Sequence, residues 1–209
     1  MDKNTQDLLE KGESLPLMEA FYTIQGEGFH KGKASYFIRI AGCDVGCHWC
    51  DVKESWDAGA HPIIPTKEIV NKSINYSDTV VVTGGEPLMW NMTSLTNGLK
   101  SKNKIVHIET SGAYKLTGIW DWICLSPKKR MNPLDEFYNA ANELKVIVYN
   151  KDDLKFAEQQ AKKVNSNAYL YLQPEWDNRE KMMPIIVDYV KNNPKWKISL
   201  QTHKYLNIP

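Results

Sequence analysis

Seven short runs of β-branched and aromatic residues, separated in several places by amphipathic helical patterns, constrain the fold of this chain most strongly. Strands that alternate with helices predict βαβ units and a mainly parallel sheet, either an open doubly wound sheet or a barrel. The strand-like runs are 36–40, 79–83, 104–109, 121–126, 144–149, 168–173 and 197–201. The helical patterns cover 66–75, 151–164 and 180–193, and the last of these contains Pro184.

Length and charge limit the domain organisation and the class of partner. A chain of 209 residues is long enough for one well-buried domain. We predict a polar, loosely held N-terminal extension at 1–17 and a single domain at 18–209. The 26 Lys and Arg residues nearly balance the 25 Asp and Glu residues and are scattered, so we expect neither a nucleic-acid partner nor a membrane partner. The polar N-terminus predicts no signal peptide, and we expect a cytoplasmic protein.

Polar side chains collect where the predicted strands end. The cysteine-rich stretch follows 36–40, and "GGEP" follows 79–83. Glu109, Ser126 and Gln173 each close a strand-like run. In parallel α/β folds, binding and catalytic sites are built at the carboxyl ends of the strands. We therefore expect a site at this edge.

Three of the four cysteines lie within eight residues, in "CDVGCHWC" at 43–50. An odd number of thiols in a reducing compartment favours metal or redox chemistry. A structural zinc site would need a fourth ligand; His48 is available but lies within the turn, and no second cysteine pair exists. An iron–sulfur cluster is held by closely spaced cysteines, and three would leave one iron open to a small molecule. Cys124, in an apolar run, is predicted to be a buried, inert thiol.

The cysteine spacing resembles that of the radical S-adenosylmethionine enzymes. The pattern is Cys-x3-Cys-x2-Cys with an aromatic residue before the last cysteine, and "TGGEP" at 83–87 is similar to that superfamily's GGE motif. The resemblance implies a 4Fe–4S cluster whose open iron is chelated by S-adenosylmethionine. It also implies reductive cleavage of that cofactor to a 5′-deoxyadenosyl radical, which abstracts hydrogen from a substrate.

Further stretches resemble one family of that superfamily, the 7-carboxy-7-deazaguanine synthases. They are 19–51, "HIETSG" (107–112), "SPK" (126–128), "QP" (173–174) and "LQTHKYLNIP" (200–209), in the order found in that family. The resemblance implies ring contraction of 6-carboxy-5,6,7,8-tetrahydropterin to 7-carboxy-7-deazaguanine, with loss of ammonia, on the route to queuosine. It also implies an incomplete (βα)6-type partial barrel, a homodimer, and an electron donor such as flavodoxin or ferredoxin.

The matched motifs imply a role for each residue. The cluster ligands are Cys43, Cys47 and Cys50. S-adenosylmethionine is expected to contact Trp49, Cys50, Asp51, Gly85, Glu86, Ser126, Pro127, Lys128, Gln173, Pro174, Glu175 and Trp176. The pterin is expected to contact Ile24, Gln25, Gly26, Arg39, Thr83, Glu109, His203 and the terminal carboxylate of Pro209, with Glu27, Arg39 and Glu109 as the catalytic residues.

Three of these assignments also have a physical basis in the sequence. Gly85 would let the backbone approach the methionine end of the cofactor, and Glu86 could accept a hydrogen bond from its ammonium group. Arg39 stands in the middle of the apolar run "YFIRI". An arginine that faces a barrel interior is expected there only to bind an anion, such as the pterin carboxylate.

One position departs from the family pattern. The residue two places after the third cysteine is usually Thr or Ser, whose hydroxyl contributes to a magnesium ion that bridges to the substrate. Here it is Val52, which has no oxygen to offer. We expect weak or absent dependence on Mg²⁺: either substrate and water alone hold the ion, or a cation such as Lys53 neutralises the substrate's charge instead.

Two other functions are compatible with the cysteine spacing. A glycyl-radical-enzyme activase has the same spacing, but its protein substrate gives no reason for the "QGEG" stretch at 25–28. A small electron carrier or zinc-binding module would use the cysteines without catalysis. The metal content and the cleavage of S-adenosylmethionine separate these possibilities.

Overall fold

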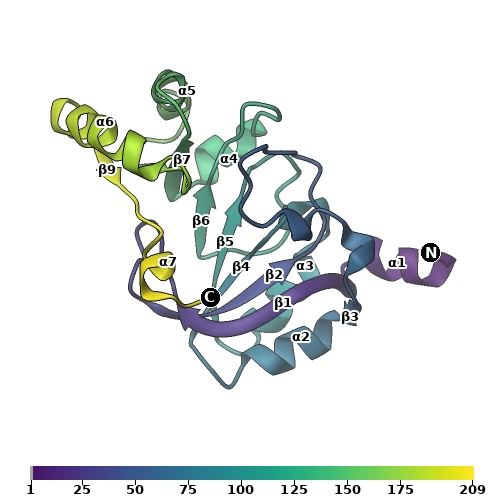
Figure 1. The fold of residues 1–209 in the computed structure, drawn as a ribbon. Helices are drawn as coiled ribbons and strands as arrows, with labels where there is room; N and C mark the ends of the chain where they lie inside the picture. Colours follow the sequence, from purple (N-terminus) through teal and green to yellow (C-terminus); the bar gives the residue numbers. More distant parts are fainter. Residues whose placement is uncertain (1) are drawn as a thin grey trace.

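The computed structural model describes residues 2–209, which form one nine-stranded sheet of order β3-β1-β2-β4-β5-β6-β7-β8-β9 (Figure 1). Strand β2 and strands β4 to β9 pair in parallel, whereas β1 is antiparallel to both β2 and β3. The mainly parallel sheet is therefore confirmed. The strands are β1 (Ser14–Ile24), β2 (Ala34–Ile40), β3 (Ile63–Pro65), β4 (Thr79–Gly84), β5 (Ile105–Thr110), β6 (Trp122–Leu125), β7 (Glu143–Val148), β8 (Tyr169–Pro174) and β9 (Trp196–Ile198).

Helices occupy most of the crossovers between parallel strands. Helix α2 precedes β4, α3 precedes β5, α4 precedes β7, α5 precedes β8 and α6 precedes β9. The crossover from β5 to β6 has no helix in the described chain. The helices are α1 (Lys3–Glu10), α2 (Thr66–Ser73), α3 (Thr93–Lys100), α4 (Asp135–Ala140), α5 (Asp152–Ala161), α6 (Arg179–Asn192) and α7 (Thr202–Leu206).

The two faces of the sheet differ in chemistry because side chains alternate along each strand. One face packs against the helices and forms the apolar core, which includes Ile38, Val82, Ile108, Leu144 and Leu172, all fully buried. The residues that follow these in sequence point to the opposite face. They are Arg39, Thr83, Glu109, Lys145 and Gln173.

Strand register brings the polar residues of that second face together. Arg39 is paired with Thr83 across β2 and β4, and Glu109 with Cys124 across β5 and β6. Cys124 is in turn paired with Glu143 across β6 and β7. A one-residue slip of any strand would exchange its polar and apolar faces, so burial of the core holds this register.

The N-terminal residues differ from our expectation of a loose extension at 1–17. Residues 3–10 form α1, and β1 begins at Ser14, so that Leu9 and Leu15 are buried at 5% and 0% exposure. The hydroxyl of Thr66, at the start of α2, donates a hydrogen bond to Gly12 O (2.7 Å). The segment is ordered because Leu15 belongs to the apolar core and α1 packs against β1.

Other elements refine the sequence analysis. The apolar run at 197–201 was expected to be a strand throughout, but β9 ends at Ile198 and the chain then turns into α7. Helix α6 continues through Pro184. The sequence analysis did not identify β1, β3, α3, α4 and α7.

We predict that Leu9→Ala lowers the free energy of unfolding by about 2–4 kcal/mol, because the change removes a buried side chain. Gln6→Ala, on an exposed position of the same helix, should change it by less than about 0.5 kcal/mol. The measurement is urea denaturation followed by circular dichroism. Equal stability of the two variants would show that α1 does not contribute to the folded domain.

Candidate active site

A cavity of about 240 Å³ opens at the carboxyl ends of the parallel strands. Its wall comes from β1, β2, β4, β5, β7 and β8 and from the loops that follow them, closed by residues from the C-terminal region. All of the predicted site residues except Pro127 line this cavity within the described chain, and their individual roles stay predictions.

The cysteine loop begins directly after β2 and is held by its backbone. Gly42 and Gly46 adopt positive φ angles of 104° and 66°. Cys43 N donates to Trp56 O (3.1 Å), and Cys50 N donates to Cys47 O (3.0 Å). These hydrogen bonds fold the loop back on itself, so that Cys43, Cys47 and Cys50 all line the cavity.

The three thiols are free, and burial raises the pKa of Cys43 and of Cys47. In the described chain, residues 2–209, no group of three or more His, Cys, Asp or Glu side chains is arranged to hold a single metal ion. A four-iron cluster does not require that arrangement, because each thiolate binds a different iron atom. The donor set of three thiolates on one loop fits such a cluster.

Gly84, the last residue of β4, and Gly85 directly after it pack against residues 40–42 at the start of the cysteine loop. A Cβ atom on Gly84 would lie 2.1 Å from Ile40 O, and one on Gly85 would lie 2.4 Å from Gly42 O. Glu86 N donates to Gly42 O (2.9 Å). We expected Gly85 to make room for the cofactor. The structure shows that it first makes room for the backbone of the cysteine loop.

The carboxylate of Glu86 is buried and accepts four hydrogen bonds. One oxygen accepts from Thr110 Oγ1 (2.7 Å) and Leu88 N (3.1 Å). The other accepts from Ser111 N (2.7 Å) and Ser111 Oγ (2.5 Å). We had expected this side chain to accept from the ammonium of S-adenosylmethionine. These hydrogen bonds join the β4 and β5 loops, and Glu86 also lines the cavity, so its contact with S-adenosylmethionine stays a prediction.

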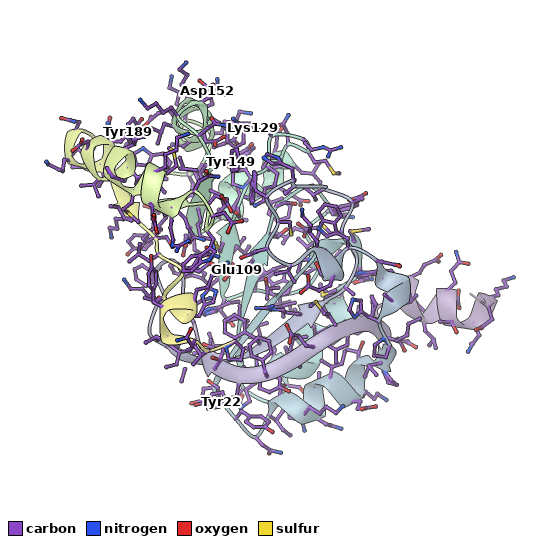
Figure 2. All side chains as sticks on the ribbon, in the orientation of Figure 1. Tyr22, Glu109, Lys129, Tyr149, Asp152 and Tyr189 are labelled. Atoms are coloured by element: carbon purple, nitrogen blue, oxygen red, sulfur yellow. The ribbon has the colours of Figure 1, made fainter. Side chains whose placement is uncertain are left out.

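A cluster of charged and polar side chains, formed by Gln25, Glu27, Glu109 and Lys145, lines another part of the cavity. Lys145 Nζ donates to Glu109 Oε2 (2.8 Å) and to Glu27 Oε2. Gln25 Nε2 donates to Glu109 Oε1 (2.9 Å), and Gln25 Oε1 accepts from Glu27 N (3.0 Å). Glu109 lies near the middle of the molecule (Figure 2).

The protonation states follow from this geometry. Enclosure alone would raise the pKa of Glu109, but the Lys145 ammonium and the Gln25 amide outweigh it and hold the pKa below its usual range. Enclosure alone would lower the pKa of Lys145, but Glu109 and Glu27 raise it well above its usual range. Glu109 and Lys145 therefore form an ionised pair at neutral pH.

Arg39 lies beside this cluster on β2 and faces the cavity, as expected. Its Nη1 donates to Glu19 Oε1 (2.9 Å), and its guanidinium carbon lies 5.2 Å from the centre of the Phe21 ring. The side chain remains 23% exposed. Because an arginine has five donor hydrogens, the pair with Glu19 leaves donors for an anion in the cavity.

The C-terminal helix α7 closes the cavity near the end of β1 (Figure 1). Thr202 N donates to Gly26 O (3.0 Å), and a Cβ atom on Gly26 would lie 2.2 Å from His203 Nδ1. Thr23 Oγ1 donates to Pro209 O (3.3 Å). Gly26 and His203, two of the residues expected to contact the pterin, therefore lie side by side although they are far apart in the sequence.

Helix α7 also contacts the residue after the third cysteine. Asp51 Oδ2 accepts from Lys204 Nζ (2.6 Å) and from Gln201 Nε2 (3.1 Å). Val52 lines the cavity with an apolar side chain, whereas Lys53 is exposed and does not line the cavity of the described chain. Lys53 is therefore not placed to neutralise a charge there.

The residues expected near adenosine line a further part of the cavity. Lys128 Nζ donates to Ser126 O (2.6 Å) and Ser126 Oγ (2.7 Å), and burial lowers its pKa. Gln173 Oε1 accepts from Ser199 Oγ (2.6 Å). Trp176 is flanked by Arg179, at 4.2 Å from its ring centre, and by Lys204, at 4.9 Å.

Comparison with known proteins shows the family. The radical SAM superfamily profile matches residues 37–122. A 7-carboxy-7-deazaguanine synthase of Flavobacterium psychrophilum is 66% identical over 209 residues, the full length of both chains. One from Synechocystis sp. is 45% identical over 196 residues, which is 93% of this chain and 94% of that one. The chain belongs to the 7-carboxy-7-deazaguanine synthase family of radical SAM enzymes.

A solved structure supports the fold of this family member. The crystal structure of QueE from Escherichia coli superposes with a TM-score of 0.81, over 96% of this chain and 99% of that one, at 24% sequence identity. The incomplete radical SAM barrel is therefore confirmed for this chain.

The sequence analysis missed several residues of the site, above all Lys145. It stands in "LKVIVY" at 144–149 and faces the cavity together with Ile147 on β7. A lone lysine within an apolar strand is the same signal that identified Arg39. Phe21, Phe37, Thr110, Ser111 and Gln201 also line the cavity; they lie within the stretches that resemble the family, but the sequence analysis gave them no role.

Cys124 is buried, as predicted, but its surroundings are not those predicted. It belongs to the polar face of β6, where its Sγ lies 3.6 Å from Glu143 Oε1. Burial, followed by the nearby Glu143, raises the pKa of this thiol well above its usual range. The neutral thiol is an inert neighbour of the charged cluster and does not line the main cavity of the described chain.

We predict that Cys43→Ala, Cys47→Ala and Cys50→Ala each abolish cluster binding, because a cluster held by two thiolates loses its protein anchor. Cys124→Ser should keep the cluster and cost about 1–2 kcal/mol of stability. Iron and sulfide counts after anaerobic reconstitution are the measurement. A Cys124→Ser protein that lacks iron, despite native circular dichroism, would contradict this assignment.

Proposed function

We propose that the protein converts 6-carboxy-5,6,7,8-tetrahydropterin to 7-carboxy-7-deazaguanine, with loss of ammonia, in queuosine biosynthesis. One observation carries the proposal: a single cavity joins three free thiols on one loop to a wall of ionised side chains that suits a pterin. Membership of the family supports the same reaction.

The thiol side of the cavity is proposed to hold a 4Fe–4S cluster and S-adenosylmethionine. Cys43, Cys47 and Cys50 would be the protein ligands of three irons. When bound, these groups supply a 5′-deoxyadenosyl radical by reductive cleavage of the sulfonium. The walls formed by residues 126–128 and 173–176, other than Pro127, would bind the nucleoside part, with Trp176 held rigid between two cations.

The part of the cavity wall that carries Glu27, Glu109 and Lys145 is proposed to bind the pterin. The pyrimidine edge of a pterin presents adjacent N–H donors, and carboxylates are the natural acceptors for them. Glu109 and Glu27 present such acceptors from the charged cluster. Arg39 would bind the pterin carboxylate with donors that the Glu19 pair leaves free. His203 would cover the bound ring from α7.

The test is product analysis on anaerobically reconstituted enzyme. With S-adenosylmethionine, dithionite and 6-carboxy-5,6,7,8-tetrahydropterin we expect 7-carboxy-7-deazaguanine and ammonia. Cleavage of S-adenosylmethionine without conversion of the pterin would disprove the substrate and favour a glycyl-radical-enzyme activase. Zinc in place of iron and sulfide would disprove the radical reaction itself.

The working context of the enzyme is also a proposal. Four unpaired cysteines support a reducing, cytoplasmic location. In the described chain no helix is long and apolar enough to cross a membrane.

We propose flavodoxin or ferredoxin as the electron donor. Tyr205 and Leu206 of α7, each 57% exposed, support a homodimer, which light scattering would test.

We predict that Gly26→Ala raises the KM for the pterin by at least about tenfold while the iron content stays unchanged. The added Cβ would collide with His203 and push α7 away from the cavity, at a cost of about 1–3 kcal/mol. The control is Gly59→Ala on the exposed 3₁₀ turn Ala58–Ala60, where a Cβ meets only Asp57 Oδ1, at 3.1 Å. An unchanged KM for Gly26→Ala would show that α7 does not shape the substrate site.

We predict weak or absent dependence on Mg²⁺. Val52 offers no oxygen, Glu27 and Glu109 are paired with Lys145, and Asp51 is paired with Lys204. Magnesium needs oxygen ligands in near-octahedral geometry, so the residues present do not fit a tightly held ion. Chelator-treated enzyme titrated with Mg²⁺ is the measurement, beside Val52→Thr. A strong requirement that saturates at low Mg²⁺ in both proteins would refute the prediction.

A further inference from the structure

We propose that Lys145 is a positioning residue that holds the Glu27 and Glu109 carboxylates together and aims them at the donor edge of the substrate. The inference rests on the proposed function, because it concerns how that site recognises a pterin. It assigns a specific task to a side chain that the cysteine and glycine motifs do not include.

The geometry places Lys145 between the two carboxylates. It lies on β7, its side chain is 3% exposed, and it forms ion pairs with Glu27 Oε2 and with Glu109 Oε2 (2.8 Å). Within residues 2–209, both carboxylates have Lys145 as their ion-pair partner. One buried cation therefore balances two neighbouring anions that come from different parts of the chain.

Lys145 also completes a closed ring of hydrogen bonds. The ring runs from Lys145 to Glu109, from Glu109 to Gln25 Nε2, and from Gln25 Oε1 to Glu27 N. The Glu27 side chain then returns to Lys145. Each carboxylate is thus fixed by one oxygen on the lysine, and its orientation in the cavity is set before a substrate arrives.

The other titratable groups near the cluster do not replace this charge. Glu143 on β7 has a raised pKa because of burial, and Cys124 on β6 has a pKa well above its usual range. His203 on α7, His107 on β5 and His30 after β1 each have a pKa lowered by enclosure. Lys128 is held by Ser126, and Arg39 is paired with Glu19. Within residues 2–209, Lys145 is therefore the cation that balances the charges of Glu27 and Glu109.

Removal of the cation has a predictable electrostatic result. Two like charges in an enclosed site repel each other, and one carboxylate then takes up a proton near neutral pH. A protonated carboxyl accepts fewer hydrogen bonds from the pterin edge. Substrate affinity would then fall as the pH is lowered, whereas in the wild type the Lys145 ammonium holds the pKa of Glu109 below its usual range.

The test uses 6-carboxypterin, an aromatic and fluorescent analogue with the same pyrimidine edge and carboxylate. Its dissociation constant is measured by fluorescence at pH 6 and pH 8 on folded protein without added cofactors. Lys145→Met is compared with Lys104→Met, the matched control. Lys104 is also buried, at 8% exposure, but donates to Ile74 O and Ser77 O, away from the cavity.

The readout is the ratio of each variant's dissociation constant to that of the wild type at the same pH. Protonation of the ligand itself affects both constants equally, so it cancels in this ratio. For Lys145→Met we expect a ratio of at least about tenfold at pH 6. This ratio should fall by about tenfold at pH 8, because the carboxylate that took up a proton is ionised again at the higher pH. For Lys104→Met the ratio should stay near one. A Lys145→Met ratio that does not change with pH would overturn the inference.

A second variant covers loss of folding. Lys145→Met/Glu27→Gln leaves one carboxylate without a like-charged neighbour, so it should fold, and its dissociation constant should depend less on pH than that of Lys145→Met. If neither Lys145→Met nor this double variant folds, Lys145 is needed for packing and the inference is wrong. If the wild type does not bind 6-carboxypterin, the proposed substrate fails instead, which distinguishes the two failures.

Discussion

The structure depends on the alternation of side chains along parallel strands. Apolar residues face the helices and form the core, and the residues next to them in sequence are forced onto the opposite face. There the strands bring Arg39, Glu109, Glu143 and Lys145 close together in a partly enclosed space. Charges in such a space must be paired, so the face becomes a network of ion pairs and hydrogen bonds. The same network is a preformed surface for a polar, planar substrate.

The cysteine loop is shaped by the neighbouring strand as much as by its own sequence. Gly84 and Gly85 allow the end of β4 to lie directly against residues 40–42. Glu86 then ties this turn to the β5 loop through Thr110 and Ser111. A cluster held by this loop would therefore be fixed to two strands. Rigid support of this kind is what a site needs when a short-lived radical has to meet its substrate in one orientation.

Residues from the two ends of the chain complete the pocket. Helix α7 contacts Gly26 after β1 and Asp51 after the third cysteine. It thereby links the proposed pterin wall to the proposed cluster wall. A shift of α7 would alter both sides at once, so we expect substrate binding and the environment of the cluster to be coupled through this helix.

The sequence alone determined the alternation of strands and helices, the three-thiol site, the family, and most of the cavity lining. These features are encoded in local spacing, such as "CDVGCHWC" and "TGGEP", which tertiary contacts cannot change. Only the tertiary structure decided that Lys145 joins Glu27 to Glu109, that Glu86 is used internally, that Lys53 lies outside the cavity, and that most of the N-terminal segment is ordered. Each of these depends on which residues, distant in the chain, come within hydrogen-bonding or packing distance. Strand register and burial set those distances, and local spacing does not contain them.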